Sequence, residues 1–370
     1  MDKVYDKIKS FIDDKQILIK KAILLNLGEA KKVCENIMQS IGGQYIELNE
    51  VNENIIVEHV DKNEIDTLYI RKKDLRLANN LLWTCATIQQ YICIDTDEIM
   101  EEEDMKSELM YKKLWNFISM NAKDEIEEGA WLNSYTREKF TKEEVNECIE
   151  NVCVKLRPFV DETKNVLEIG CSSGLTMFCL APKVKKYVAL DMSNIVINKA
   201  KEKIEANNMQ KIELYCLYAH ETDQIHHNEF DICILNSVVQ CFDGHIYLYK
   251  VIKNIIDKMS DNGIIFFGDI MDAQKKNDFE KSLIKYKEAN NFADTKMDFS
   301  RELFLSKDFF HNLPFDFPQI SNIEVSNKIY SIENELTRFR YDVLVTLDKK
   351  KSSIPNKPRT KSWYGCYIID

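Results

Sequence analysis

Residues 165–174, with the sequence NVLEIGCSSG, decide the fold of this chain. The first half of this stretch is an apolar run typical of a buried strand. The second half is a glycine-containing turn that leads into a helical pattern over 174–180. Glycines in such a turn permit a tight bend and let a ligand approach the backbone closely. The stretch therefore predicts either a ligand-binding corner of an α/β sheet or an ordinary strand–turn–helix junction.

Strand and helix patterns continue to alternate from this stretch to residue 272. KKYVALD, KIELYCLYA, FDICILNSVV and GIIFFGDIMD are expected to be strands, and 195–206 and 245–259 are expected to be helices. This alternation predicts a parallel sheet covered by helices on both faces. A helix is expected near 275–290, and NIEVSNKIY and YDVLVTLD are expected to be late strands that close the sheet edge.

The flanking segments have a different character. Residues 1–105 predict a small α+β module of unknown role, in which Leu24 to Ile37 has helical spacing. Residues 106–160 predict a helical lid or pre-core segment. The core is expected over 161–350, with 291–320 as an inserted, mostly loop region on the substrate side. Residues 351–370 are expected to form a basic, proline-containing tail.

Composition places the 370 residues among globular proteins with a large core, since 45% are hydrophobic and 30% are charged. With 50 Lys+Arg against 61 Asp+Glu, the net charge is −11. This acid excess argues against nucleic-acid binding, which needs a basic surface. The 11 cysteines contain no C-x-x-C pair, and the 6 histidines are scattered, so we predict no metal site.

Thiols in this pattern fit a reducing cytosol. The charged N-terminus lacks the apolar segment of a signal peptide, and no run approaches the ~20 apolar residues of a membrane helix. We therefore expect a cytoplasmic protein that does not bind membranes.

Two acidic residues indicate the ligand of the turn. Glu168 lies in the first strand, two positions before Gly170, and Asp191 ends the next strand. An acid before the glycine would repel a phosphate and suit a cation, and a carboxylate at the second strand tip can hold ribose hydroxyls. The turn also begins E-x-G and has Ser172 where a dinucleotide site has its middle glycine. These features favour S-adenosylmethionine over a dinucleotide.

Five co-linear segments resemble motifs of class I S-adenosylmethionine-dependent methyltransferases, in particular the methyltransferase domains embedded in nonribosomal peptide synthetases. WLNSYT (131–136) is similar to W-x-S-S-Y-T-G, and EIGCSSG (168–174) to E-I-G-C-G-T-G. NSVVQCF (236–242), FGDI (267–270) and NELTRFRYD (334–342) are similar to N-S-V-V-Q-Y-F, F-x-G-D-V and N-E-L-T-x-Y-R-Y-D. Ser172 and Arg137 replace glycines of these motifs, and Cys241 replaces a tyrosine. Ser172 can still present its backbone to the ligand if its φ is negative.

This resemblance implies a Rossmann-like fold that binds S-adenosylmethionine and releases S-adenosylhomocysteine. Glu168 is expected at the amino-acid end of the cofactor and Asp191 at its ribose. Met192 and His220 either contact the adenine or serve as core and loop residues, and Tyr135 either closes over the cofactor or packs in the core. The expected cofactor-binding residues are Tyr135, Glu168, Gly170, Ser172, Gly174, Asp191, Met192, Ala219, His220, Asn236 and Ser237.

The candidate catalytic residues on the acceptor side are Gln240, Asp269 and Glu335. A carboxylate of Asp269 or Glu335 would orient an amine and take its proton. For Glu335 and Arg340 the alternative is a surface ion pair beside a strand.

The reaction expected from the resemblance is N-methylation of an amino acid, a peptide or a carrier-bound intermediate in natural-product biosynthesis, by a stand-alone enzyme. An O- or C-methyltransferase and a non-catalytic module that binds S-adenosylmethionine for a partner are the alternatives. Residues 1–105 are a candidate for carrier docking, for a homodimer contact or for covering the substrate.

Overall fold

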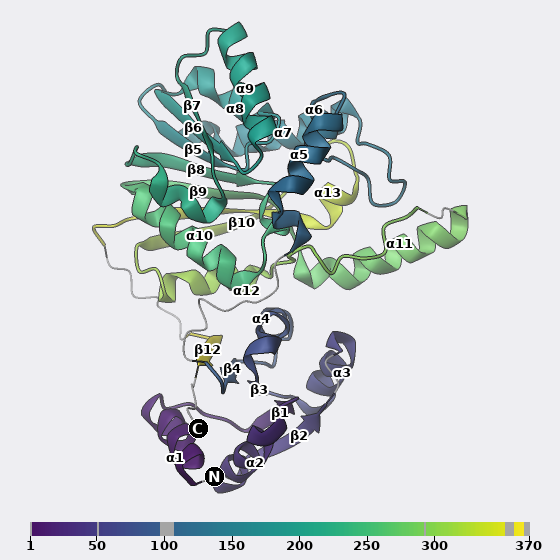
Figure 1. Ribbon diagram of the computed structural model, residues 1–370, viewed down its shortest axis with the longest axis vertical. Helices are drawn as coiled ribbons and strands as arrows, with labels where there is room; N and C mark the ends of the chain where they lie inside the picture. Colours follow the sequence, from purple (N-terminus) through teal and green to yellow (C-terminus); the bar gives the residue numbers. More distant parts are fainter. Residues whose placement is uncertain (1, 50–51, 97–106, 292–293, 352–358, 366–370) are drawn as a thin grey trace. The chain divides into compact units, whose positions relative to one another are not determined.

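The structure is a computed structural model that describes residues 2–49, 52–96, 107–291, 294–351 and 359–365. The chain divides into two compact units, whose helices and strands are labelled in Figure 1. The larger unit comprises 106–243 and 248–355, and the smaller unit comprises 1–105, 244–247 and 356–370. The acceptor-side and cofactor-side residues expected from the sequence all belong to the larger unit.

A seven-stranded sheet in the order β10-β11-β9-β8-β5-β6-β7 forms the centre of the larger unit (Figure 1). Strands β5 to β9 pair in parallel, whereas β11 runs antiparallel to both β9 and β10. The strands are β5 (Asn165–Ile169), β6 (Lys186–Asp191), β7 (Ile212–Cys216), β8 (Phe230–Asn236), β9 (Met259–Met271), β10 (Ile320–Asn327) and β11 (Arg340–Leu347). The expected Rossmann-like sheet, including its two late strands, is confirmed.

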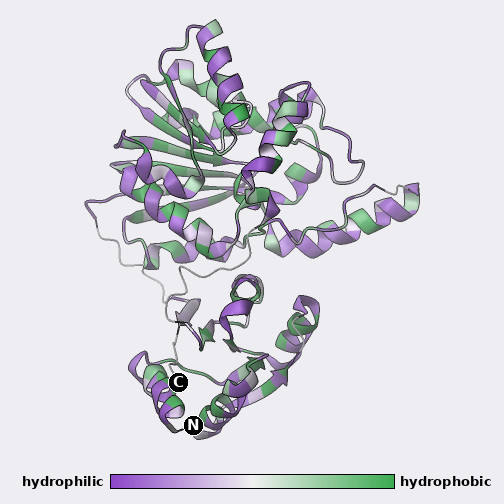
Figure 2. Cartoon of the chain, in the orientation of Figure 1, coloured by the Kyte–Doolittle hydropathy of each residue, from purple (hydrophilic) through white to green (hydrophobic). Residues whose placement is uncertain are grey.

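The strands are rich in apolar residues because helices cover the sheet. Figure 2 shows hydrophobic residues along the strands and both hydrophobic and hydrophilic residues on the surrounding helices. The helices of this unit are α5 (Lys112–Asn121), α6 (Glu125–Glu128), α7 (Lys142–Leu156), α8 (Leu175–Leu180), α9 (Asn194–Ala206), α10 (His245–Lys258), α11 (Lys276–Asn290), α12 (Lys307–Asn312) and α13 (Glu335–Arg338), with the first turn of α10 grouped with the smaller unit.

Local signals explain several helix starts. Thr141 and Glu144 form a reciprocal capping box at the start of α7. The Ser193 side chain caps α9 by accepting a hydrogen bond from the Val196 amide. Because Ser193 follows Asp191 by two residues, this cap begins the helix directly after the tip of β6.

The smaller unit contains a five-stranded sheet in the order β12-β4-β3-β1-β2, and all its pairs are parallel. Its strands are β1 (Lys21–Leu25), β2 (Gln44–Leu48), β3 (Thr67–Ile70), β4 (Gln90–Cys93) and β12 (Ser362–Gly365), and its helices are α1 (Asp2–Asp14), α2 (Lys31–Ser40), α3 (Glu53–Asn63) and α4 (Leu75–Thr84). The module is thus α/β, where the sequence suggested α+β, because crossover helices join parallel strands.

Two sequence expectations in this unit are wrong. Leu24 and Leu25 belong to strand β1, and the helix begins only at Lys31. The segment assigned to a tail contributes β12, which pairs with β4. There the Trp363 ring lies edge-on to Trp83 with centroids 5.8 Å apart. Both errors have one cause, since short buried strands are defined by partners distant in the chain.

No helix in the described part of the chain combines the length and apolarity needed to cross a bilayer.

Candidate functional site

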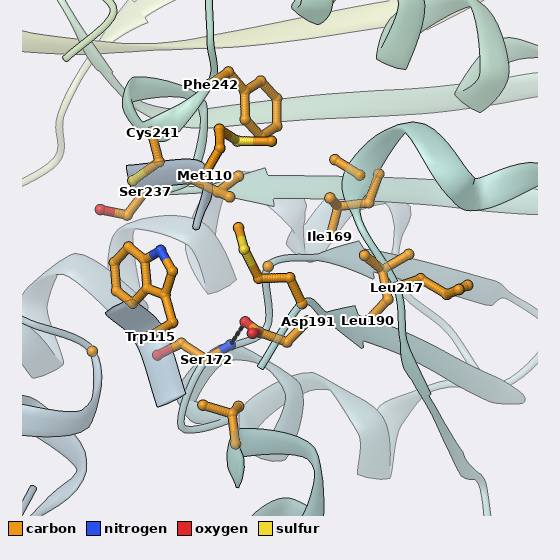
Figure 3. Close-up of a pocket in the computed structure, with 16 residues that line it drawn as sticks. Met110, Trp115, Ile169, Ser172, Leu190, Asp191, Leu217, Ser237, Cys241 and Phe242 are labelled. Atoms are coloured by element: carbon orange, nitrogen blue, oxygen red, sulfur yellow. Dashed lines mark hydrogen bonds between the residues drawn. The ribbon is translucent and has the colours of Figure 1, made fainter. Parts of the chain in front are cut away.

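The carboxyl ends of β5, β6 and β8 meet at one edge of the larger sheet, where parallel α/β sheets bind ligands. A cavity of about 670 Å³, including its mouth, opens there, and we call it the apolar cavity. Figure 3 shows Trp115, Ile169, Leu190 and Leu217 around this space. Its lining residues are Met110, Trp115, Gly129, Ile169, Gly170, Ser172, Leu190, Asp191, Met192, Val196, Leu217, Ala219, Ser237, Val238, Cys241 and Phe242.

Asp191 is the carboxylate in this apolar surrounding. Its Oδ2 accepts from the Ser172 amide at 3.1 Å, as drawn in Figure 3, and its Oδ1 accepts from the Ser193 amide at 2.8 Å. Burial raises the pKa of Asp191 to about 6, although these two amide donors oppose the shift. Asp191 thus joins the β5 turn to the start of α9, and it lines the apolar cavity.

The turn after β5 needs backbone conformations that favour glycine. Gly170 has φ +73°, and a β-carbon there would lie 2.6 Å from a Val238 methyl group. Gly174 has φ +85°, and a β-carbon would lie 2.7 Å from the Phe178 ring. Ser172 also has positive φ, at +45°, so the condition of a negative φ is not met. This conformation aims the Ser172 amide at Asp191.

A second cavity, which we call the turn cavity, adjoins the first. It is lined by Gly129, Trp131, Ile149, Glu168, Gly170, Cys171, Ser172, Ser173, Leu175, Thr176, Asn236 and Ser237. Glu168 is 3% exposed and accepts a hydrogen bond from the Tyr187 hydroxyl at 2.9 Å. Burial raises the pKa of Glu168 to about 8 despite that bond. The buried Oδ1 of Asn236 has no donor among the described residues, and it lies against Gly268 of β9.

A third cavity contrasts with these two, because its wall carries five charged side chains. We call it the charged cavity. Its lining residues are Leu109, Trp115, Gly129, Ala130, Trp131, Leu132, Ser134, Arg137, Phe140, Ser237, Gln240, Cys241, Met271, Lys296, Phe299, Glu302, Glu335, Leu336 and Arg340. Ser237 and Gly129 line all three cavities, so the three meet at these residues.

Glu335 and Gln240 line the charged cavity and both carry hydrogen-bond acceptors. Both Glu335 carboxylate oxygens accept from Ser134, one from its amide and one from its hydroxyl, each at 2.8 Å. Burial raises the pKa of Glu335, and the nearby Arg340 guanidinium opposes this. Gln240 Nε2 donates to the Ser237 carbonyl at 2.8 Å, while its buried Oε1 has no donor among the described residues. Glu335 is only 4% exposed, which excludes the surface ion pair.

Asp269 belongs instead to a buried charge network behind the cavity wall. Its Oδ2 accepts from the Ser237 hydroxyl at 2.6 Å and from Arg340 at 2.5 Å, and its Oδ1 lies 3.1 Å from Lys328 Nζ. Burial alone would raise the pKa of Asp269, but Arg340 and Lys328 hold it well below its usual range. The expectation that Asp269 takes a proton is therefore wrong, since two cations stabilise its charged form. Asp269 positions Ser237.

The network continues to the next strand. Asp342 on β11 accepts from the Asp269 amide at 2.8 Å and from Lys155 Nζ at 2.7 Å, and it lies 3.4 Å from Lys328 Nζ. Lys328 is 6% exposed and follows β10 in the chain. Lys328 and Lys155 were not predicted from the sequence, because no local pattern shows that either lysine pairs with an acid distant in the chain.

The predicted cofactor residues fall into two groups. The apolar or the turn cavity is lined by Glu168, Gly170, Ser172, Asp191, Met192, Ala219, Asn236 and Ser237. Tyr135, Gly174 and His220 are absent from these described linings. Tyr135 donates to or accepts from Ser282 at 2.7 Å and packs on Phe279 of α11, so it has the core-packing role.

Gly174 and His220 differ from expectation for separate reasons. Gly174 serves the turn by its backbone, as the residue before α8. His220 lies in the short helix after β7, where its carbonyl accepts from Asn254. The residues that the sequence analysis missed, Trp115 and Gly129, lie in the segment before the sheet. The amphipathic pattern around 110–118 was the signal that could have found Trp115.

Comparison with known proteins agrees with this geometry. Residues 160–334 match a family described as a methyltransferase domain. This match identifies residues 160–334 as a methyltransferase domain, in agreement with the resemblance to class I S-adenosylmethionine-dependent methyltransferases. The matched range contains Glu168, Asp191 and Ser237, and so covers the turn and the strand tips around the apolar cavity.

The methyltransferase is similar to parts of much longer proteins. It is 30% identical over 243 residues to chondramide synthase of Chondromyces crocatus, covering 63% of this chain and 6% of that protein. It is 25% identical over 329 residues to the nonribosomal peptide synthetase TES of Alternaria alternata, covering 82% of this chain and 6% of that protein. Among solved structures, the N-methyltransferase NodS of Bradyrhizobium japonicum shares 15% identity at a TM-score of 0.40, over 57% of this chain and 89% of NodS.

The cavities fit S-adenosylmethionine as the cofactor of this methyltransferase. The apolar cavity offers Leu190, Met192 and Leu217 for a flat aromatic ring, with the Asp191 carboxylate at its wall. The turn cavity offers Glu168, a carboxylate that suits a cationic ammonium group. At Gly170 a β-carbon would clash with the Val238 side chain, so this turn requires glycine.

Proposed function

We propose that this methyltransferase transfers methyl groups to a nitrogen, the α-amine of an amino acid, a peptide or a carrier-bound intermediate in natural-product biosynthesis. One observation carries the proposal. At Ser237 the charged cavity joins the cavities that suit the cofactor, and beside this junction the unpartnered Gln240 Oε1 can accept a hydrogen bond from an amine N–H. The nonribosomal peptide synthetases among its relatives support the substrate class.

Glu335 is the residue that we propose as proton acceptor. An α-amine has a pKa of about 8, so much of it is protonated at neutral pH and cannot act as a nucleophile. The raised pKa of Glu335 brings this carboxylate closer to the pKa of the amine, which makes proton transfer more favourable. Ser134 holds both carboxylate oxygens, which fixes the orientation of the group.

Other residues of the chain act by position. S-adenosylmethionine, when bound, supplies a methyl group on a sulfonium that needs no further activation. Gln240 aligns the amine, and Asp269 holds the Ser237 hydroxyl at the junction of the cavities. Trp115 lines both the apolar cavity and the charged cavity and excludes water. Alignment and desolvation of this kind can account for most of the acceleration of a displacement between two held atoms.

Product analysis tests the reaction. The full chain is incubated with methyl-labelled S-adenosylmethionine and a panel of free amines, peptides and amino acids loaded on a separate carrier protein. Mass spectrometry then locates the label. We expect it on nitrogen, and label on oxygen or carbon of the same acceptors would refute the proposal.

Substitution of Glu335 tests its role. We expect Glu335→Gln to lower kcat by about 10²–10³-fold, as general-base removal does, with unchanged affinity for S-adenosylmethionine. Glu302→Gln is the matched control, because Glu302 lines the same cavity but is paired with Lys296. Equal loss in both variants would contradict the assignment of Glu335 as the base.

A further inference from the structure

Two cysteines approach each other between the helices that flank the cofactor turn. Cys153 lies in α7 and Cys179 in α8, and their Sγ atoms are 2.6 Å apart. Cys153 is buried in the main core cluster of the larger unit, and Cys179 packs against that cluster while keeping part of its surface exposed. Neither thiol is among the described residues that line the three cavities, so this pair is separate from the proposed site.

We propose that Cys153 and Cys179 are a modification site, a thiol pair that closes to a reversible disulfide and ties α7 to α8 across the cofactor turn. A disulfide has an S–S distance of about 2.05 Å, so closure requires a shift of only about half an ångström. The closed ring would contain β5 and the whole turn from Gly170 to Gly174.

The surroundings of the two thiols favour different roles in the oxidation. A hydrogen bond with the Cys153 thiol and the positive charge of Lys183 lower the pKa of Cys179. Cys179 is also the more exposed of the two, so it is the thiolate that meets an oxidant. Burial and the neighbouring Cys179 raise the pKa of Cys153, which suits the second, resolving position.

The oxidant is hydrogen peroxide. The Cys179 thiolate attacks the peroxide, the O–O bond breaks, and Cys179 sulfenic acid and one water form with a proton from the medium. Cys153 sulfur then attacks Cys179 sulfur, the S–O bond breaks, and a second water leaves with the Cys153 proton. The peroxide gains two electrons and the two thiols lose two. A small thiol reductant reverses the bond by exchange.

Closure is expected to stabilise the protein without blocking the cofactor. The disulfide removes conformations of the unfolded loop between the two cysteines, and the folded positions change little. We therefore expect the melting temperature to rise by several degrees, and the Kd for S-adenosylmethionine to stay within twofold.

The test uses the full chain, reduced and then treated with hydrogen peroxide. Intact mass spectrometry should show a loss of 2 Da, and peptide mapping should place the bond between Cys153 and Cys179. Cys179→Ala and Cys153→Ala should lose the bond and the rise in melting temperature. The control Cys216→Ser, which removes an exposed thiol elsewhere, should keep both.

Three results would overturn the proposal. In the first, the wild-type protein oxidises at Cys216 and does not form the 153–179 bond. In the second, the disulfide maps to another pair of cysteines. In the third, the 153–179 bond forms but the melting temperature does not rise. Mapping on the wild type decides the first two even if an alanine variant does not fold. Failure of N-methylation would not affect any of these readouts.

Discussion

Two pairs of carboxylates on the larger sheet have opposite electrostatic surroundings. Glu168 and Asp191, on β5 and β6, are bonded to a tyrosine hydroxyl and two backbone amides, and burial raises their pKa values to about 8 and about 6. Asp269 and Asp342, on β9 and β11, are bonded to cations, and their pKa values are lowered.

The difference indicates which carboxylates have a counter-charge within the protein and which do not. A buried charge is costly unless an opposite charge compensates it. At Asp269 and Asp342 the chain supplies that charge itself, through Lys328, Arg340 and Lys155. At Glu168 and Asp191 no lysine or arginine of the described residues does so, and we propose that bound S-adenosylmethionine supplies the missing charge near Glu168.

The largest effect is expected from removing a cation of the compensated pair. Lys328→Met leaves Asp269 and Asp342 short of a buried partner and should cost about 3–5 kcal/mol of unfolding free energy. Urea denaturation measures it. Lys186→Met is the control, because its ion pair with Glu213 is half-exposed and worth under about 1 kcal/mol. A loss at Lys328 no larger than at Lys186 would show that the network is not needed for stability.

A smaller effect is expected from removing Asp191, one of the two carboxylates without a counter-charge. This effect concerns the affinity for the cofactor and not the stability of the fold. Asp191→Ala removes the carboxylate at the cavity wall, which is also the acceptor for two backbone amides. We therefore expect calorimetry to show S-adenosylmethionine binding about 30–100-fold more weakly, or by about 2–3 kcal/mol. Asp231→Ala is the matched control, since Asp231 also accepts a backbone amide, from Asn165, but at the start of β8. Full affinity in Asp191→Ala would rule out the role of Asp191 in cofactor binding.

The smallest effect is a pH dependence of that affinity. A raised pKa means that Glu168 is mostly protonated below about pH 8 in the free protein, and binding a cation favours its ionised form. Affinity for S-adenosylmethionine should therefore rise as the pH increases from 6.0 to 7.5, by at most about tenfold per unit. Glu168→Gln cannot ionise and should flatten this slope. A slope that persists in the variant would assign the titration to another group.

Sequence patterns were sufficient where the signal is local. The apolar run at Asn165–Ile169 followed by Gly170 predicted a strand and a turn, and both are present because side-chain periodicity and glycine conformation act over a few residues. Eight of the eleven predicted cofactor residues line the two cavities that suit the cofactor, because they lie at strand tips whose order follows from the alternation of strands and helices.

Contacts between distant residues required the tertiary structure. Whether Asp269 is a proton acceptor depended on Lys328 and Arg340, 59 and 71 positions further along the chain, and whether Tyr135 covers a cofactor depended on Phe279. Strand β12 exists because β4 lies beside it. By itself the sequence determined the strand–turn–helix corner and the order of the core. Packing decided which buried acids already have counter-charges, because the free energy of a charge depends on its three-dimensional surroundings.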